Sequence, residues 1–122
     1  MSLAVRIPVN FPKSARLLKP ADFRFRSYRR FDSSNFKFLY STEGTGRMGV
    51  SISKKVLRRA TARNRVRRLL KESFRHYRSA LQHSDVHVIG LSGLDKVWRD
   101  LTRADIDDVF EGLCERIYAK RQ

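Results

Sequence analysis

The sequence is 122 residues long and carries 27 lysines and arginines against 12 aspartates and glutamates, for a formal net charge of +15 at pH 7. This length predicts a single domain over residues 1–122 with one core, and 41% hydrophobic residues argue against a disordered basic tail. Such a polycation attracts polyanions and releases counterions on binding them, so nucleic acid is the expected class of partner.

Membrane and secreted classes are disfavoured. The longest apolar run, Val86–Leu91, is far too short to span a bilayer, and Met1–Asn10 has no long apolar segment of the signal-peptide kind. The lone Cys114 cannot form an internal disulfide, which fits a reducing cytoplasm. A basic amphipathic helix could lie on an anionic membrane, but here its apolar face is needed to cover a sheet. We therefore expect a cytoplasmic protein with no membrane partner.

The first 30 residues predict an arm followed by a helix. Residues 1–10 carry no pattern and are expected to form a loose arm. Pro20 suits the first position of a helix, where its missing N–H would have no partner, and this helix is expected to end near Arg30. Phe23 and Tyr28 lie along it among arginines, and core packing would account for at least one of its aromatic rings.

Two strands are predicted next. Phe36, Phe38 and Tyr40 alternate with other residues, which is typical of a strand with one aromatic face. After a turn that contains two glycines, Met48–Val56 is expected to return as the paired strand of a hairpin. Lys54 falls on the otherwise apolar face of this second strand, where the most basic part of the chain begins.

The basic stretch, Lys54–Arg78, holds eleven cations and one carboxylate, Glu72. Its apolar residues recur every three or four positions and predict a helix from about Thr61, a plausible N-cap, to Gln82. The buried face should contain Val66, Leu69, Leu70, Phe74, Tyr77 and Leu81. The opposite face should contain Asn64, Arg67, Arg68, Lys71, Arg75 and Arg78.

Solvation alone would explain an ordinary charged helix face, but such faces mix the two signs of charge. Here three successive i,i+4 pairs have like charge: Arg63 with Arg67, Arg67 with Lys71, and Lys71 with Arg75. Because such pairs repel each other, an anionic partner is favoured, and a polyphosphate is the natural one.

The remaining chain predicts a strand and two helical segments. Val86–Leu91 should enter the same sheet by a crossover, and Leu94–Leu101 should form a short helical turn. Thr102 and Asp105 are spaced like a capping box and open a last helix. Its buried stripe should contain Ile106, Val109, Phe110, Leu113 and Ile117, with Cys114 at its border.

Carboxylates gather in Asp85–Glu115, which holds eight of them against three cations. Asp107, Asp108 and Glu111 could suggest a metal site, but they are more simply placed on the solvent side of the last helix, whose first turns favour anions. We expect this acidic half to face away from the bound polyanion.

The residues contain no autonomous active site. His76, His83 and His87 with Cys114 lack metal-ligand spacing, and no serine or cysteine lies in a nucleophile motif. Cleavage of RNA by protein side chains needs a general acid and a general base placed beside the same phosphate, and the basic stretch offers His76 alone. On residues alone, the chain is a binding protein.

Two segments resemble the protein subunit of bacterial ribonuclease P. They are Met48–Val56 (MGVSISKKV) and Ala62–Arg75 (ARNRVRRLLKESFR), whose Arg63-Asn64-Arg65 core lies on the long helix in that family. Phe11-Pro-Lys, Arg16-Leu17, Asp22-Phe23 and Asp85–Leu91 match as well. The resemblance therefore covers nearly the whole chain.

This resemblance implies a two-layer α/β sandwich of the α+β type, with a small, mostly antiparallel sheet of about four strands and the order α-β-β-(β)-α-β-α. It also implies a left-handed βαβ crossover, an exception to the right-handed rule. In function, it implies one protein bound to the catalytic RNA and to the 5′ leader of precursor tRNA. RNA and Mg²⁺ would then perform the hydrolysis, and the isolated protein would be inactive.

The resemblance and the basic stretch together assign residues to two surfaces. The RNA-binding surface would contain Lys54, Lys55, Arg58, Arg63, Asn64, Arg65, Arg67, Arg68 and Lys71. The leader-binding cleft would contain Phe23, Phe38, Tyr40 and Lys54. Aromatic rings on an open strand face would stack on bases with little sequence preference. No metal-binding residue is assigned.

The chain departs from the family pattern at two places. The family has a second phenylalanine one helical turn beyond the first, whereas here Ser27 lies four residues on and Tyr28 five, so Tyr28 is a second candidate for the cleft. Leu94–Leu101 is longer and more apolar, and its Trp98 could cover core or offer a contact surface.

Two other functions fit part of the pattern. A structural RNA-binding protein such as a ribosomal protein would share the basic composition, and a double-stranded DNA binder could place the basic helix in a major groove. Aromatic residues on a strand face favour single-stranded RNA over both, and the nucleic acid that co-purifies would distinguish the three.

Overall fold

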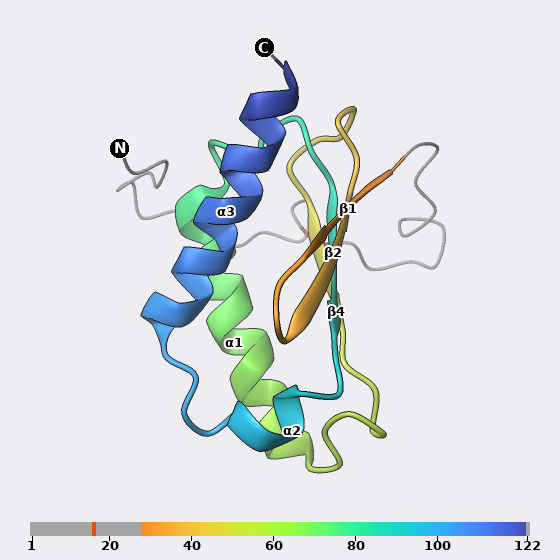
Figure 1. The fold of residues 1–122 in the computed structure, drawn as a ribbon, viewed down its shortest axis with the longest axis vertical. Coiled ribbons are helices and arrows are strands. Elements are labelled where there is room, and N and C mark those ends of the chain that lie inside the picture. The colour runs from red at the N-terminus through yellow and green to blue at the C-terminus, as the bar shows by residue number, and fades with distance from the viewer. Residues whose placement is uncertain (1–15, 17–27, 122) are drawn as a thin grey trace.

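The computed structural model describes residue 16 and residues 28–121, which form one sheet with two long helices on one side of it (Figure 1). The elements are β1 (Arg29–Asp32), β2 (Phe36–Tyr40), β3 (Met48–Ser51), α1 (Ala60–Tyr77), β4 (Val86–Gly90), α2 (Leu94–Val97) and α3 (Arg103–Arg121). α1 and α3 lie side by side against the sheet, which confirms the predicted two-layer α+β architecture.

The strand order is β1-β2-β4-β3. β4 pairs antiparallel with β2 and parallel with β3, so the predicted hairpin between β2 and β3 is wrong. β4 lies between them because its run of valine and isoleucine suits an inner strand, whereas the short β3 forms an outer one. The parallel pairing of β3 with β4 requires a crossover, and α1 supplies it. The hairpin of this fold is instead β1 with β2.

Two predicted boundaries are wrong where tertiary pairing overrides local pattern. Of the helix expected over residues 20–30, positions 20–27 lie outside the described residues, and Arg29 and Arg30 belong to β1, paired with Tyr40 and Leu39. The second strand ends at Ser51 rather than at Val56. There the chain turns, because the Ser53 carbonyl accepts hydrogen bonds from the N–H groups of Val56 and Leu57 at 3.1 and 3.0 Å.

The core lies between the sheet and the two helices. The apolar stripe predicted for the long helix is confirmed, with Val66, Leu70 and Phe74 fully buried, although α1 begins at Ala60 and ends at Tyr77. Phe110 of α3 packs edge-on against Phe38 of β2, with ring centroids 5.6 Å apart. The three aromatic residues of β2 therefore point into the core.

The start of α3 has the predicted capping box. The Thr102 N–H donates to the Asp105 carboxylate at 2.9 Å, and the Asp105 N–H donates to the Thr102 hydroxyl at 3.2 Å. This reciprocal pair satisfies backbone donors that a helix N-terminus otherwise leaves without partners. Four of the five residues predicted for the α3 stripe are buried, and Val109 is partly buried at its edge. Burial raises the pKa of the Cys114 thiol to about 12, so this cysteine is an inert core residue.

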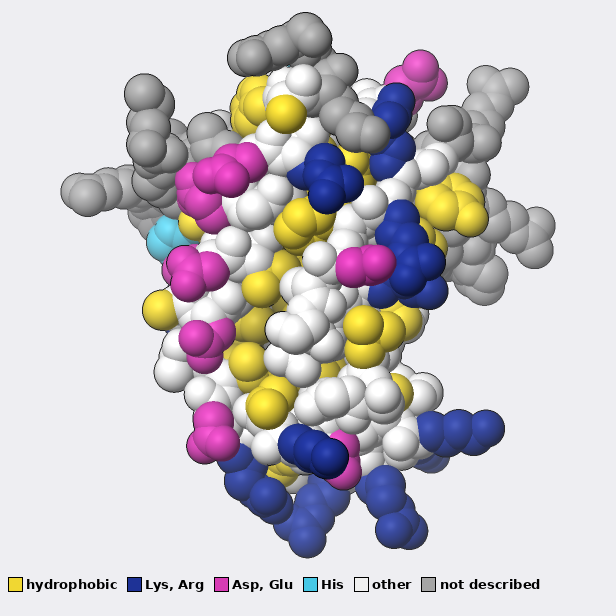
Figure 2. All heavy atoms as spheres, viewed as in Figure 1, with side chains coloured by type: hydrophobic (Ala, Val, Ile, Leu, Met, Phe, Trp, Pro, Cys, Tyr) yellow, Lys and Arg dark blue, Asp and Glu magenta, His cyan; other side chains and the backbone are white. Residues whose placement is uncertain are grey.

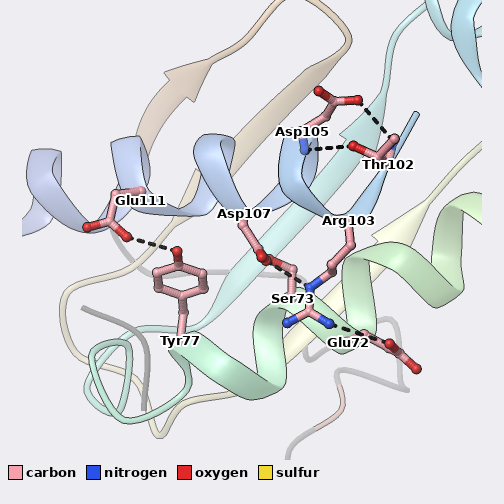
Figure 3. A network of polar contacts seen from close by, with 8 residues as sticks. All are labelled: Glu72, Ser73, Tyr77, Thr102, Arg103, Asp105, Asp107 and Glu111. Atoms are coloured by element: carbon pink, nitrogen blue, oxygen red, sulfur yellow. Dashed lines mark hydrogen bonds and ion pairs between the residues drawn. The ribbon is translucent and has the colours of Figure 1, made fainter. Parts of the chain in front are cut away.

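Polar contacts join α1 to α3 (Figure 3). The Ser73 hydroxyl donates to Asp107 at 2.6 Å, and the Tyr77 hydroxyl donates to Glu111 at 2.8 Å. Burial and the Glu111 carboxylate raise the pKa of Tyr77, which keeps this phenol protonated. The prediction that Asp107 and Glu111 face solvent is wrong, because both are acceptors for buried hydroxyls of α1. Asp108 alone of the three acidic residues is exposed.

Candidate nucleic-acid interface

A shallow hollow of about 420 Å³ follows the side of α1 that faces away from the core. It is lined by Arg16, Asn64, Arg67, Arg68, Lys71, Glu72 and Arg75. Arg16 reaches it because residue 16 bridges to Met48 at the outer edge of the sheet. Five of the seven lining residues were predicted for the outward helix face, so the structure brings that set together.

This hollow is strongly cationic. The side chains of Arg67, Arg68 and Lys71 form no ion pair or hydrogen bond with any other residue that the structure describes. Glu72 is the one carboxylate of the hollow, and it lies 3.5 Å from the guanidinium of Arg103 on α3. The like charges along the helix are thus left for an external anion to neutralise.

Two other arginines of the predicted surface turn toward their own chain. The Arg63 guanidinium donates to the carbonyls of Leu57 and Arg58 at 2.7 and 2.9 Å, which ties the helix to the turn before it. Arg65 reaches the segment after α2, and it donates to the carbonyl of Leu101 at 2.6 Å and to that of Trp98 at 3.3 Å. These side chains have part of their hydrogen-bonding capacity already used inside the protein.

The other predicted RNA-binding residues lie before the helix. Lys54, Lys55 and Arg58 are all exposed in the turn that leads from β3 into α1. Figure 2 shows lysine and arginine side chains at the end of the molecule where α2 and the start of α1 lie, and others on the right side, with most acidic side chains along the left edge. In this view, most of the acidic side chains thus lie on a different side from most of the basic ones.

The predicted leader cleft is not formed as proposed. Phe38 and Tyr40 are 0% and 1% exposed beneath α1 and α3, so neither offers an open ring to a base. Phe23 lies outside the described residues. Tyr28 is 60% exposed, and Lys54 is exposed beyond the end of β3. The alternation in β2 was interpreted correctly as a strand, but its aromatic face is the core face because the helices need an apolar surface to cover.

Comparison with known proteins decides the family. The family model described as Ribonuclease P matches residues 11–117, which is most of the chain. The chain belongs to the ribonuclease P protein family. The ribonuclease P protein component of Marinobacter nauticus is 38% identical over 107 residues, covering 84% of this chain and 80% of the relative. That of Legionella pneumophila is 40% identical over 90 residues, covering 70% and 77%.

Solved structures agree on the fold. The ribonuclease P protein of Staphylococcus aureus superposes with a TM-score of 0.66 at 24% identity, covering 83% of this chain and 93% of that one. The protein from Thermotoga maritima gives 0.64 at 21% identity, covering 75% and 84%. Family membership makes the chain a protein subunit of the ribonuclease P ribonucleoprotein endonuclease, an enzyme of tRNA processing. Among the described residues, no helix is long and apolar enough to cross a membrane.

The second face of the sheet, opposite the helices, supplies candidates that sequence reasoning missed. Strand pairing places Lys37 beside Ile89 and Leu39 beside His87 on this face, all four partly buried. Ser51 extends the face, with its hydroxyl 2.7 Å from His87 Nε2. Burial and nearby Lys37 lower the pKa of His87, so the ring is neutral at pH 7 and can act as a hydrogen-bonding group. The sequence contained the signal for four of them, since Lys37 and Leu39 alternate with the aromatic residues of β2, and His87 and Ile89 alternate with Val86, Val88 and Gly90 in β4.

Proposed function

We propose that this ribonuclease P protein binds the catalytic RNA of the ribonucleoprotein through the outward face of α1. The single observation that carries this proposal is the hollow in which Arg67, Arg68 and Lys71 have no internal ion partner among the described residues. Arginine forks match phosphate oxygens in geometry, and their spacing on one helix face suits successive phosphates of a folded RNA. Because the protein has one such helix face, we expect one protein to bind each RNA.

Hydrolysis is assigned to the RNA and Mg²⁺ rather than to the protein. A cationic surface attracts RNA phosphates, and those phosphates in turn are the groups that attract divalent cations. We infer that Mg²⁺ is held mainly by RNA in the holoenzyme. The role of the protein is then to neutralise phosphate repulsion and to position the substrate for removal of its 5′ leader.

The second face of the sheet is the proposed place for the single-stranded leader of precursor tRNA. Leu39 and Ile89 give an apolar strip for bases, Lys37 gives a cation for a phosphate, and His87 with Ser51 gives neutral hydrogen-bonding groups. None of these groups demands a particular base. Sequence-tolerant contact suits an enzyme that processes many precursors.

Reconstitution tests the main proposal. The purified chain should have no nuclease activity of its own, and it should raise cleavage of precursor tRNA by a ribonuclease P RNA transcript at low Mg²⁺. The Mg²⁺ dependence should shift because the protein supplies positive charge that the cation otherwise provides. Specific 5′ cleavage by RNA-free protein, or no effect on the RNA, would contradict the proposal. A structural RNA-binding protein would bind the transcript without accelerating it.

Comparison of two substrates tests the leader surface. Lys37→Ala should weaken holoenzyme binding of precursor tRNA about fourfold at 0.15 M salt, the effect of one phosphate contact to a single strand, and leave mature tRNA unchanged. Phe38→Leu is the matched control, because Phe38 is buried and the change should lower stability without a leader-specific effect. Equal losses for both tRNAs on Lys37→Ala would exclude a leader contact at this face.

A further inference from the structure

A second hollow, of about 370 Å³, lies where the start of α1 meets α2, apart from the cationic hollow along the helix. Arg58 and Arg59 come to it from the turn before α1, and Trp98 and Arg99 come from the segment that follows α2. Asp95 is the one carboxylate in its lining. The hollow therefore joins parts of the chain about 40 positions apart into one positively charged site.

Arg99 is held in a defined position there. Its guanidinium carbon lies 4.7 Å from the centroid of the Trp98 ring, a cation–π geometry, while the side chain remains exposed. The Trp98 ring itself is half-buried and packs against the core, so it acts as a fixed platform. The N–H groups at the rim of the stacked guanidinium stay available for an acceptor.

Arg65 fixes this segment to α1. Its guanidinium donates to carbonyls on both sides of Arg99, those of Trp98 and Leu101. It also lies 3.4 Å from the carbonyl of Arg99 itself. A helix residue that belongs by position to the RNA-binding face is thus the tether that places Arg99 opposite Arg58 and Arg59.

The three arginines of this hollow, Arg58, Arg59 and Arg99, form no ion pair with any residue in the described part of the chain, and Arg58 and Arg59 are exposed. A single carboxylate, Asp95, leaves the site with an excess of two positive charges. Lys54 and Lys55 lie in the same turn as Arg58, so the positive surface continues from this hollow toward β3.

We propose that this hollow is a second RNA-contact site, in which Arg99 binds a phosphate of the catalytic RNA together with Arg58 and Arg59. Arg65 acts there as a positioning residue. The proposal rests on the proposed function and extends it to a segment outside the basic helix. RNA is favoured over an acidic protein because a guanidinium stacked on a tryptophan offers both a phosphate fork and a planar surface for a base.

Salt-dependent binding tests the role of Arg99. With a ribonuclease P RNA transcript, Arg99→Ala should lower the magnitude of the log K against log salt slope by roughly 0.7 to 0.9 and weaken binding about fivefold at 0.15 M salt. Arg116→Ala is the matched control, because Arg116 is also exposed and stacked on an aromatic ring, that of Phe31 at 5.4 Å, but lies on α3. Equal slopes for the Arg99 and Arg116 variants would overturn the proposal.

Fluorescence tests the positioning role, because Trp98 is the only tryptophan of the chain. In the wild type, its emission should change as the RNA complex forms, and in Arg65→Met the emission of the free protein should already shift to longer wavelength as the segment is released. Arg65→Lys should restore part of the free-protein emission. Unchanged Trp98 emission through complete complex formation would exclude RNA from this hollow.

These outcomes separate the site from the proposed function. Suppose that binding of the transcript by the wild-type protein depends steeply on salt concentration. If substitution of Arg67 and Arg68 then reduces this dependence while Arg99→Ala does not, only the second site is excluded. If the wild-type protein fails to bind the transcript, the proposed function fails with it.

Discussion

Two pairs of arginines on one helix are used in opposite ways. Arg63 and Arg65 donate to backbone carbonyls of segments before and after α1, whereas Arg67 and Arg68, a single turn further on, line the open hollow. All four belong to the same basic run in the sequence. Arginine in a basic motif can therefore stabilise the protein itself, and its hydrogen-bond partners show whether it has this role or is open to a ligand.

The largest expected effect is the loss of stability on substitution of Arg65, one of the two arginines that donate to backbone carbonyls. Arg65→Ala removes charge-assisted hydrogen bonds to at least two carbonyls and should lower the free energy of unfolding by about 2–3 kcal/mol. Arg67→Ala is the matched control, with an expected change within about 0.5 kcal/mol. Urea denaturation of the two variants provides the measurement. Equal stability would show that the Arg65 contacts contribute nothing and that the two pairs do not differ.

Substitution of Arg67 and Arg68, which line the hollow, should weaken RNA binding and leave the fold intact. Arg67→Ala with Arg68→Ala should reduce the slope of log K against log salt for ribonuclease P RNA by about 1 to 2, and weaken binding roughly thirtyfold at 0.15 M salt. The fold should persist, because neither side chain packs in the core. An unchanged slope in the folded double variant would place the RNA interface elsewhere.

Arg63→Ala should have a smaller effect on stability than Arg65→Ala. The substitution removes the hydrogen-bond donor of two carbonyls, those of Leu57 and Arg58, which belong to the turn next to the helix. Because Arg58 is exposed, water can replace the lost donor there. We expect a loss of about 1–2 kcal/mol in the same denaturation experiment. A loss larger than that of Arg65→Ala would mean that the turn before α1, rather than the segment after α2, is the main element stabilised by arginine.

Glu72→Gln should have the smallest effect and the opposite sign in binding. This carboxylate opposes RNA in the cationic hollow, so its removal should tighten RNA binding by about two- to fourfold at low salt. Stability should change by less than about 0.5 kcal/mol, since Arg103 keeps its closer partner Asp107 at 2.8 Å. Weaker RNA binding would indicate that Glu72 orients a neighbouring arginine toward the RNA.

Features that depend on a single helix or strand could be predicted from the sequence. The three- and four-residue spacing in α1 fixed which residues are buried, and the alternation in β2 fixed Phe36, Phe38 and Tyr40 on one face. Thr102 and Asp105 predicted the start of α3, because the capping box joins two residues only three positions apart in the sequence. The cationic face of α1 was also predictable, because helix geometry places its residues without reference to any other element.

Which face of a helix or strand packs against which partner depends on contacts between elements, and these could not be predicted from the sequence. Periodicity shows that β2 has two different faces, but the packing of α1 and α3 made the aromatic one the core and left Lys37 and Leu39 on the other face of the sheet. The place of β4 between β2 and β3 likewise depends on pairing between strands far apart in sequence. Arg65 finds its carbonyls more than 30 residues away. Contacts of this kind are set by the close packing of distant elements, which the pattern within a single element does not encode.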